Sequence, residues 1–264
     1  MGRKRTINQS SCNKDYSCLK GFCPSFVTID GGRLRKRAPA DLGEIGDLPE
    51  PVSRPSLDRP YNIGVGGVGG TGVLTIGALL GMAAHIEGKA SMILDMSGLA
   101  QKGGAVLSHV RLSQNPAEVT CSRIVTGTAD LVIAADEVVA AAKETITLCE
   151  SSRTYGLINT HLIPTAGFVL DRDFNFQSGK VGRVLQTAVR KDSTFFNFTR
   201  PAETLLGDSI ATNMMMMGYA YQKGLLPLTS EAIEQAIEVN GVAVKMNVEA
   251  FRLGRLAVVD PARL

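Results

Sequence analysis

One stretch of the chain, IGVGGVGGTGVL, is rich in glycine and could bind a phosphate group. It contains two overlapping G-x-G-x-x-G patterns, made of Gly64, Gly66 and Gly69, and of Gly67, Gly69 and Gly72. Both follow an expected strand and open an expected helix. Glycines there let the backbone approach a ligand, and the helix start at Thr71 offers free N–H groups and a positive dipole. The same glycines could instead make a tight turn or let another subunit approach closely.

A carboxylate and a second glycine pair follow this stretch. Asp95 ends the next expected strand, 26 residues after Gly69, and dinucleotide-binding enzymes carry a ribose-binding acid about 20 residues after their glycines. Taken alone, the glycine-rich stretch together with Asp95 indicates a nicotinamide or flavin site. Asp95 could equally be a loop carboxylate with its own partners. The next loop contains Gln101, Lys102, Gly103 and Gly104, which a plain dehydrogenase does not need.

Three of the five cysteines lie close together, at Cys12, Cys18 and Cys23. Their spacing differs from that of zinc ribbons, which contain C-x2-C pairs. Cys23 is followed by proline, as is the last ligand of bacterial ferredoxin motifs. Three thiolates cannot complete an all-cysteine iron–sulfur site, so a fourth ligand lies elsewhere or the site is vestigial. Cys121 and Cys149 fall in the later part of the chain and are expected to be buried apolar residues.

The three histidines form no recognisable catalytic motif with other residues. His161 follows an expected strand and is the best placed of them, because loops at the carboxyl ends of strands carry function in open α/β sheets. His85 ends an apolar helix, and His109 lies within an alternating strand. A structural role is the more common one for such histidines. The chain contains no Ser/His/Asp pattern, H-E-x-x-H or Walker lysine motif.

The composition is that of an ordinary globular protein. The 264 residues correspond to one large domain or two smaller ones. Hydrophobic residues make up 44% and charged residues 20%, which excludes bulk disorder. No apolar run reaches the roughly 18 residues of a membrane span, and the basic N-terminus lacks the apolar stretch of a secretory signal. The net charge of +3 comes from residues 1–60, so the rest of the chain lacks the basic excess that is typical of nucleic-acid-binding domains.

Three zones follow one another along the chain. Residues 1–35 are polar and contain the clustered cysteines. Residues 36–60 hold five of the eleven prolines and are expected to form an extended linker that packs only sparsely on the rest. From Tyr61, strands alternate with helices, which predicts a parallel, doubly wound α/β sheet. Later helices are expected around 181–190, 202–222, 230–238 and 242–256, and Met214–Met217 is expected to fill the core.

The combination of these segments resembles a known enzyme family. QSSCNKDYSCLKGFCPSFVTIDGG, the proline-rich linker and GVGGVGGTGVLTIGALLGMAAHIEGK together resemble the fused indolepyruvate:ferredoxin oxidoreductases, which are 2-oxoacid:acceptor oxidoreductases. Residues 1–35 look like the end of the thiamine-binding part. Residues 61–264 look like the γ (pyruvate/ketoisovalerate oxidoreductase) domain, with a Rossmann-like sheet and C-terminal helices. The stretch from Gln101 to Leu112 is similar to the Q-[RK]-G-G loop of that family.

The resemblance implies thiamine-dependent decarboxylation of a 2-oxo acid, with electrons passing through iron–sulfur clusters to ferredoxin and the acyl group passing to coenzyme A. It places thiamine diphosphate and Mg²⁺ in domains that this chain lacks, because the G-D-G…N-N signature of thiamine sites is absent. The chain therefore looks like a piece of the enzyme, truncated at both ends or encoded separately, and inactive alone. Expected partners are the thiamine-binding domains and ferredoxin, in a cytoplasmic oligomer without nucleic acid or membrane.

The resemblance also implies the site residues. Cys12, Cys18 and Cys23 are expected to ligate a [4Fe–4S] cluster, with the fourth ligand upstream. The two glycine segments are expected at the interface with the thiamine-binding domains; they comprise Gly64, Gly66, Gly67, Gly69, Gly70, Thr71, Gly72, Gln101, Lys102, Gly103 and Gly104. Two alternatives remain open. One is a stand-alone NAD(P)- or FAD-binding oxidoreductase, and the other is a binding or assembly module without a catalytic role.

Overall fold

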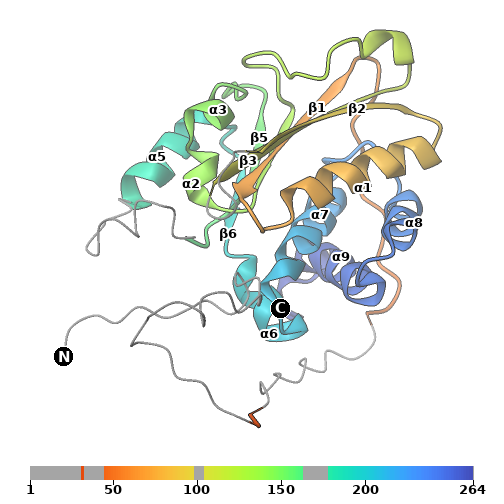
Figure 1. Ribbon diagram of the computed structural model, residues 1–264, viewed down its shortest axis with the longest axis vertical. Coiled ribbons are helices and arrows are strands. Elements are labelled where there is room, and N and C mark those ends of the chain that lie inside the picture. The colour runs from red at the N-terminus through yellow and green to blue at the C-terminus, as the bar shows by residue number, and fades with distance from the viewer. Residues whose placement is uncertain (1–30, 33–44, 98–103, 163–177, 264) are drawn as a thin grey trace.

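The computed structural model describes residues 31–32, 45–97, 104–162 and 178–263. In this part of the chain, six strands form one sheet in the order β2-β3-β1-β4-β5-β6, with helices on both faces (Figure 1). The strands are β1 (Tyr61–Val68), β2 (Ala90–Ser97), β3 (Ala105–Ser113), β4 (Leu131–Ala134), β5 (Tyr155–Asn159) and β6 (Thr194–Phe196). The α/β class with additional C-terminal helices is thus confirmed.

The described helices lie mostly where the apolar periodicity predicts them. They are α1 (Val73–Ile86), α2 (Glu137–Ala140), α3 (Lys143–Ile146), α5 (Ser178–Ala188), α6 (Thr199–Leu206), α7 (Thr212–Gln222), α8 (Ser230–Asn240) and α9 (Val244–Val259). Short 3-10 turns occupy Pro116–Glu118, Ser209–Ala211 and Pro261–Arg263. The helix expected over 202–222 is divided instead, because Gly207 adopts a left-handed φ of 78° and ends α6. None of the described helices has the length and apolar character to cross a bilayer.

One strand runs against the others, which differs from the expected all-parallel sheet. Strand β3 pairs antiparallel with both β1 and β2, whereas β4, β5 and β6 run parallel to β1. The cause is the short connection from β2 to β3, which leaves only residues 98–104 between them. A parallel pair needs a crossover of roughly a dozen residues. Strand β2 consequently lies at the sheet edge, separated from β1 by β3.

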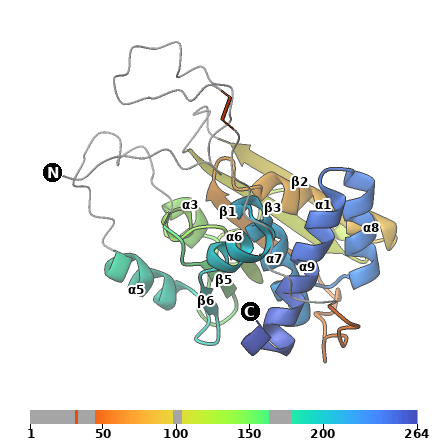
Figure 2. The ribbon, with the colours of Figure 1, turned by 90° about the horizontal axis from the view of Figure 1, so that it is seen from below.

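The larger core lies between the sheet and helices α1, α7, α8 and α9, which gather on one face (Figure 2). Met214–Met217 are fully buried there, so their expected role as core filler is confirmed. Helices α7 and α9 approach closely at two glycines. A Cβ atom added to Gly218 would lie 1.9 Å from the Phe251 carbonyl oxygen, and one added to Gly254 would lie 1.9 Å from that of Met215. These two contacts set the distance between the helices.

The smaller core lies on the opposite face, beneath α2, α3 and α5. Two glycines of β1 make room for it. Gly64 faces Leu148, with 3.2 Å between an added Cβ and that side chain, and Gly66 faces Val139 at 3.5 Å. The glycine-rich sequence of β1 therefore lets this second layer pack directly on the strand.

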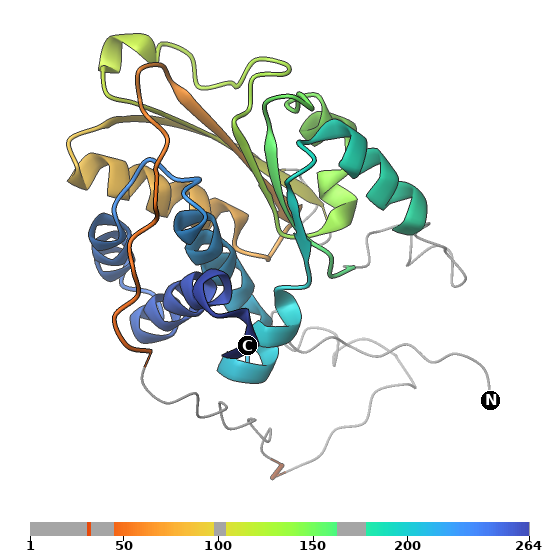
Figure 3. The ribbon, with the colours of Figure 1, turned by 180° about the vertical axis from the view of Figure 1, so that it is seen from behind.

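Residues 45–60 contain no helix or strand, as expected of the linker, but they are not sparsely packed. The Pro49 carbonyl accepts hydrogen bonds from Gln222 in α7 (2.8 Å) and from Arg255 in α9 (3.1 Å). The Glu50 carboxylate accepts from Arg255 and Ser230 at 3.2 Å each, and from the Tyr221 hydroxyl. The expectation of sparse packing is therefore wrong for these residues, which run along the C-terminal helices (Figure 3). A domain boundary at Tyr61 remains a proposal.

Candidate functional site

The carboxyl ends of the parallel strands β1, β4 and β5 meet at one edge of the sheet, which we call the carboxyl edge. Strand β3 begins at the same edge, because Ala105 pairs with Val68, the last residue of β1. Strand β2 ends at this edge too, because its last residue, Ser97, pairs with Val106 of β3. Ligands of open α/β sheets bind at this kind of edge.

The glycine turn after β1 and the glycine pair before β3 meet at the carboxyl edge. The Gly69 amide donates a hydrogen bond of 2.8 Å to the Gly104 carbonyl. Gly70 and Gly72 have φ values of +94° and +79°, in the left-handed region that glycine tolerates best. Thr71 closes the turn, because its hydroxyl donates to the Val68 carbonyl at 2.7 Å. The structure therefore joins two segments that the sequence separates by more than thirty residues.

The start of α1 faces this turn without a cap. Gly72 occupies the N-cap position and offers no side-chain acceptor, and the first turn contains no acid. The amides of Val73, Leu74 and Thr75 have no acceptor among the described residues. An anion or a partner carbonyl could accept from these amides. The Leu74 side chain is 42% exposed beside them, so the helix start combines free amides with an apolar contact.

Two buried polar side chains hold the carboxyl edge together. Asp136 follows β4 and is fully buried. Its carboxylate accepts from the amides of Val68 and Val139 at 2.8 Å each, which ties the end of β1 to the start of α2. Burial raises the pKa of this carboxyl above its ordinary value, and the backbone N–H groups offset only part of the rise.

Asn159 has the same function at the end of β5. Its side-chain amide donates to the Ala135 carbonyl at 2.8 Å and to the Thr199 hydroxyl at 2.9 Å, and its oxygen accepts from the Phe198 amide at 3.0 Å. Sequence reasoning missed both residues as parts of the site. The available signal was the position of Asp136 just before E-V-V-A, which is typical of a helix N-cap.

The predicted glycines divide into two groups. Gly69, Gly70, Thr71, Gly72 and Gly104 lie at the carboxyl edge. Gly64 and Gly66 are buried residues of β1 that make room for the side chains packed on the smaller-core face. Gly67 is also buried, but an added Cβ would lie 2.7 Å from the Thr71 hydroxyl and 2.9 Å from Ala135, so this glycine lies directly beside the glycine turn. Gln101, Lys102 and Gly103, like Cys12, Cys18 and Cys23, lie outside the described residues.

The position of Asp95 removes the main support for a dinucleotide site. Asp95 is an exposed residue within β2, opposite Ser108 of β3, which in turn pairs with Val65 of β1. Dinucleotide enzymes of this sheet type place the acid on the strand next to β1. Here the antiparallel β3 lies between the two strands, so the carboxylate lies two strands away from the glycine turn.

The histidines and the two later cysteines have separate roles. His85 is exposed in the last turn of α1, as expected. His161 lies at the carboxyl edge, where its amide donates to Asn159.

Cys149 is half-buried, and burial raises its pKa to about 11, so it remains a thiol. Cys121, expected to be buried, is exposed because it lies in the loop after Glu118 and outside the sheet. Within the described ranges, no three or more His, Cys, Asp or Glu side chains cluster to hold a metal ion.

The buried imidazole of His109 predicts stability that increases with pH. Its Nδ1 accepts from the Ile124 amide at 2.9 Å, and burial, together with the nearby Arg123, lowers its pKa. In the unfolded chain, His109 binds a proton with the ordinary pKa of about 6.5. The contribution of the neutral, buried His109 to stability is therefore complete above that pH and is lost as the pH falls through the lowered pKa of the folded state. Urea unfolding gives the free energy of unfolding at about pH 7.5 and at about pH 5. The difference between these two values should be smaller in His109→Asn than in the wild type, by roughly 1 kcal/mol.

The asparagine keeps an oxygen that can accept from Ile124 but does not titrate. His85→Asn is the control, because it makes the same chemical change at an exposed position. An equal pH dependence in His109→Asn and wild type would contradict the assignment of the buried proton.

Comparisons with known proteins agree on one family. The profile of the pyruvate ferredoxin/flavodoxin oxidoreductase family matches residues 62–257. Indolepyruvate oxidoreductase subunit IorB of Pyrococcus horikoshii is 26% identical over 210 residues, which cover 78% of this chain and 100% of that subunit.

Solved structures show the same fold. The γ subunit of a keto/oxoacid ferredoxin oxidoreductase from Geobacter sulfurreducens has a TM-score of 0.52 at 22% identity, covering 75% of this chain and 98% of that one. The 2-oxoglutarate:ferredoxin oxidoreductase from Magnetococcus marinus, solved with 2-oxoglutarate, coenzyme A and succinyl-CoA, has a TM-score of 0.58 at 14% identity. The match covers 78% of this chain and 32% of that one.

Proposed function

Because this chain belongs to the pyruvate ferredoxin/flavodoxin oxidoreductase family, we propose that it is the γ part of an indolepyruvate-type 2-oxoacid:ferredoxin oxidoreductase. The assembled enzyme converts a 2-oxo acid and coenzyme A to an acyl-CoA and CO₂, and the electrons released reduce ferredoxin. The similarity to IorB subunits supports the aryl-pyruvate class of substrate. Thiamine diphosphate with Mg²⁺, held by partner domains, would supply the decarboxylation chemistry.

The observation that carries this proposal is the junction of Gly69 and Gly104 at the carboxyl edge. It joins the two segments that the resemblance assigns to the interface with the thiamine-binding domains. Within the part of the chain that the structure describes, Gly69–Gly72, Gly104 and the first turn of α1 make this face. The free amides of α1 can bind backbone carbonyls of the partner or phosphate oxygens of coenzyme A.

Apolar side chains at the same edge suit a protein partner. Leu74 is 42% exposed, Leu162, which follows β5, is 36% exposed, and Phe196 at the end of β6 is 45% exposed. Leu162 and Phe196 belong to neighbouring segments, because the Thr160 amide donates to the Phe196 carbonyl at 3.0 Å. Burying large apolar side chains provides most of the binding energy in interface cores.

The remaining parts of the proposal concern the N-terminal segment. We assign Cys12, Cys18 and Cys23 as ligands of a [4Fe–4S] cluster whose fourth ligand lies outside residues 1–35. We also propose the division into a cysteine-containing segment (1–35), a linker (36–60) and a γ-type domain (61–264), in a cytoplasmic oligomer that donates electrons to ferredoxin.

Co-purification with the thiamine-binding part tests the proposal. The two proteins should form a stable complex that reduces a viologen dye in the presence of indolepyruvate and coenzyme A, whereas neither protein should do so alone. Activity with pyruvate or 2-oxoglutarate but not with indolepyruvate would overturn the substrate assignment. Absence of any complex would overturn the assignment of this chain as the γ part.

Leu74→Asp should weaken assembly with the thiamine-binding part at least about tenfold, because a buried unpaired charge replaces an apolar contact. The fold should be retained, since an acid is favourable in the first turn of a helix. Val125→Asp is the control. Val125 is 64% exposed and lies in the loop leading to β4, at the other end of the sheet. Equal dissociation constants for the two variants, measured by analytical ultracentrifugation, would show that the carboxyl edge is not the interface.

A further inference from the structure

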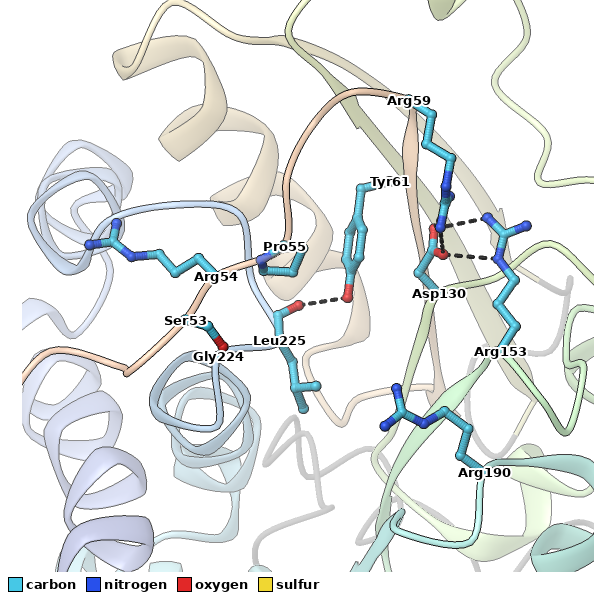
Figure 4. A pocket seen from close by; sticks show the side chains of 10 residues that line it. All are labelled: Ser53, Arg54, Pro55, Arg59, Tyr61, Asp130, Arg153, Arg190, Gly224 and Leu225. Atoms are coloured by element: carbon cyan, nitrogen blue, oxygen red, sulfur yellow. Dashed lines mark hydrogen bonds and ion pairs between the residues drawn. The ribbon is translucent and has the colours of Figure 1, made fainter.

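A pocket of about 330 Å³ lies at the end of the sheet opposite the carboxyl edge (Figure 4). We call this end the amino edge, because Tyr61 begins β1 here, Asp130 immediately precedes β4, and Arg153 lies two residues before the start of β5. The linker residues Ser53–Pro55 form one wall and the strand ends form the other. Strand β1 has eight residues, so the pocket is roughly 25 Å from the glycine turn.

Asp130 organises the positive charge of this pocket. Its side chain is 6% exposed, and it pairs with both Arg59 at 2.7 Å and Arg153 at 2.9 Å. It also accepts from the Asn62 amide at 2.9 Å. Burial alone raises the pKa of Asp130, but the hydrogen bonds from the two arginines outweigh burial and hold the pKa below its usual value. One carboxylate thus pairs with two guanidinium groups, so one positive charge remains uncompensated.

Arg190 adds a third guanidinium group, which points toward the space between Tyr61 and Arg153 (Figure 4). It lies 5.7 Å from the centre of the Tyr155 ring, which supports it from one side. Its acidic partner, Asp192, is 58% exposed and also interacts with Lys223. No described residue accepts from the Nη1 groups of Arg153 or Arg190. These donors therefore remain available to a ligand.

We propose that this pocket binds the oxyanion of a small molecule, either a phosphate or a carboxylate group, through Arg153 and Arg190. Guanidinium groups bind such oxygens in pairs of parallel hydrogen bonds. Asp130 holds Arg153 in place before the ligand arrives. Because of its distance from the glycine turn, the site is separate from the face proposed for the 2-oxo acid chemistry.

Titration calorimetry of the full chain with inorganic pyrophosphate and, separately, with succinate tests the proposal. At least one probe should bind to one site, and Arg190→Gln should weaken that binding at least about tenfold, since a charge-assisted hydrogen bond is lost. Arg183→Gln on α5, which removes an equal charge outside the pocket, should bind as wild type does. Binding of pyrophosphate alone would identify a phosphate ligand, and binding of succinate alone would identify a carboxylate ligand.

A second measurement avoids any folding defect of the variants. In the wild-type chain, the ligand should protect Arg190 from modification by phenylglyoxal and should leave Arg183 reactive, as read by mass spectrometry. Three results would overturn the proposal: no binding of either probe, equal weakening by Arg190→Gln and Arg183→Gln, or ligand binding without protection of Arg190.

Discussion

Replacing Cys18 with alanine in the assembled enzyme is expected to abolish 2-oxoacid-dependent reduction of a viologen dye. Cys12, Cys18 and Cys23 supply three thiolates toward a [4Fe–4S] cluster, and each cluster of this type needs four protein ligands. Removing one of them should empty the site and interrupt the path of the electrons. A single turnover of decarboxylation should persist in the variant, because CO₂ leaves before the electrons do. Iron and sulfide content, dye reduction and CO₂ release are the three measurements.

Cys121→Ala is the matched control for this experiment. Cys121 is an exposed free cysteine outside the cluster, so its replacement should change neither the iron content nor the dye reduction. The isolated chain should bind iron and sulfide incompletely after anaerobic reconstitution, and the partner should complete the site. An assembled enzyme in which all three alanine variants retain full iron content and dye reduction would refute the assignment of these cysteines as ligands.

Gly218→Ala should strongly destabilise the α/β part of the chain. The added Cβ would lie 1.9 Å from the Phe251 carbonyl oxygen of α9, which is backbone and cannot rotate away. Helices α7 and α9 would have to separate by more than 1 Å within the larger core. Overpacking of this kind costs about 3 kcal/mol, which lowers the melting temperature of a domain of this size by roughly 10 °C.

Gly182→Ala in α5 is the same chemical change, but we expect it to stabilise the protein. Gly182 has no atom within 4 Å of an added Cβ, so the alanine should stabilise the helix by up to about 1 kcal/mol. Thermal unfolding followed by circular dichroism compares the two variants. A Gly218→Ala protein as stable as wild type would mean that the two helices are farther apart than in this structure.

The order of strands and helices could be read from the sequence, but periodicity alone did not give the direction of β3. Alternating apolar residues identified Ala105–Ser113 as a strand, because periodicity records which side of a strand is buried. Periodicity does not record the neighbour of a strand. The decisive fact was the length of the connection between β2 and β3, which is too short for a parallel crossover. The same short connection places β3 between β2 and β1, so Asp95 lies two strands away from the glycine turn.

The sequence by itself determined the α/β class, the family and the glycine turn between β1 and α1, because these depend on residues that are neighbours along the chain. Only the tertiary structure decided that Gly69 contacts Gly104, that Gly64 and Gly66 serve packing, and that Arg59, Asp130, Arg153 and Arg190 gather at one end of the sheet. Strand order and helix packing bring such residues together through space. A side chain that acts only through distant partners, as Asp130 does, therefore leaves no local pattern in the sequence.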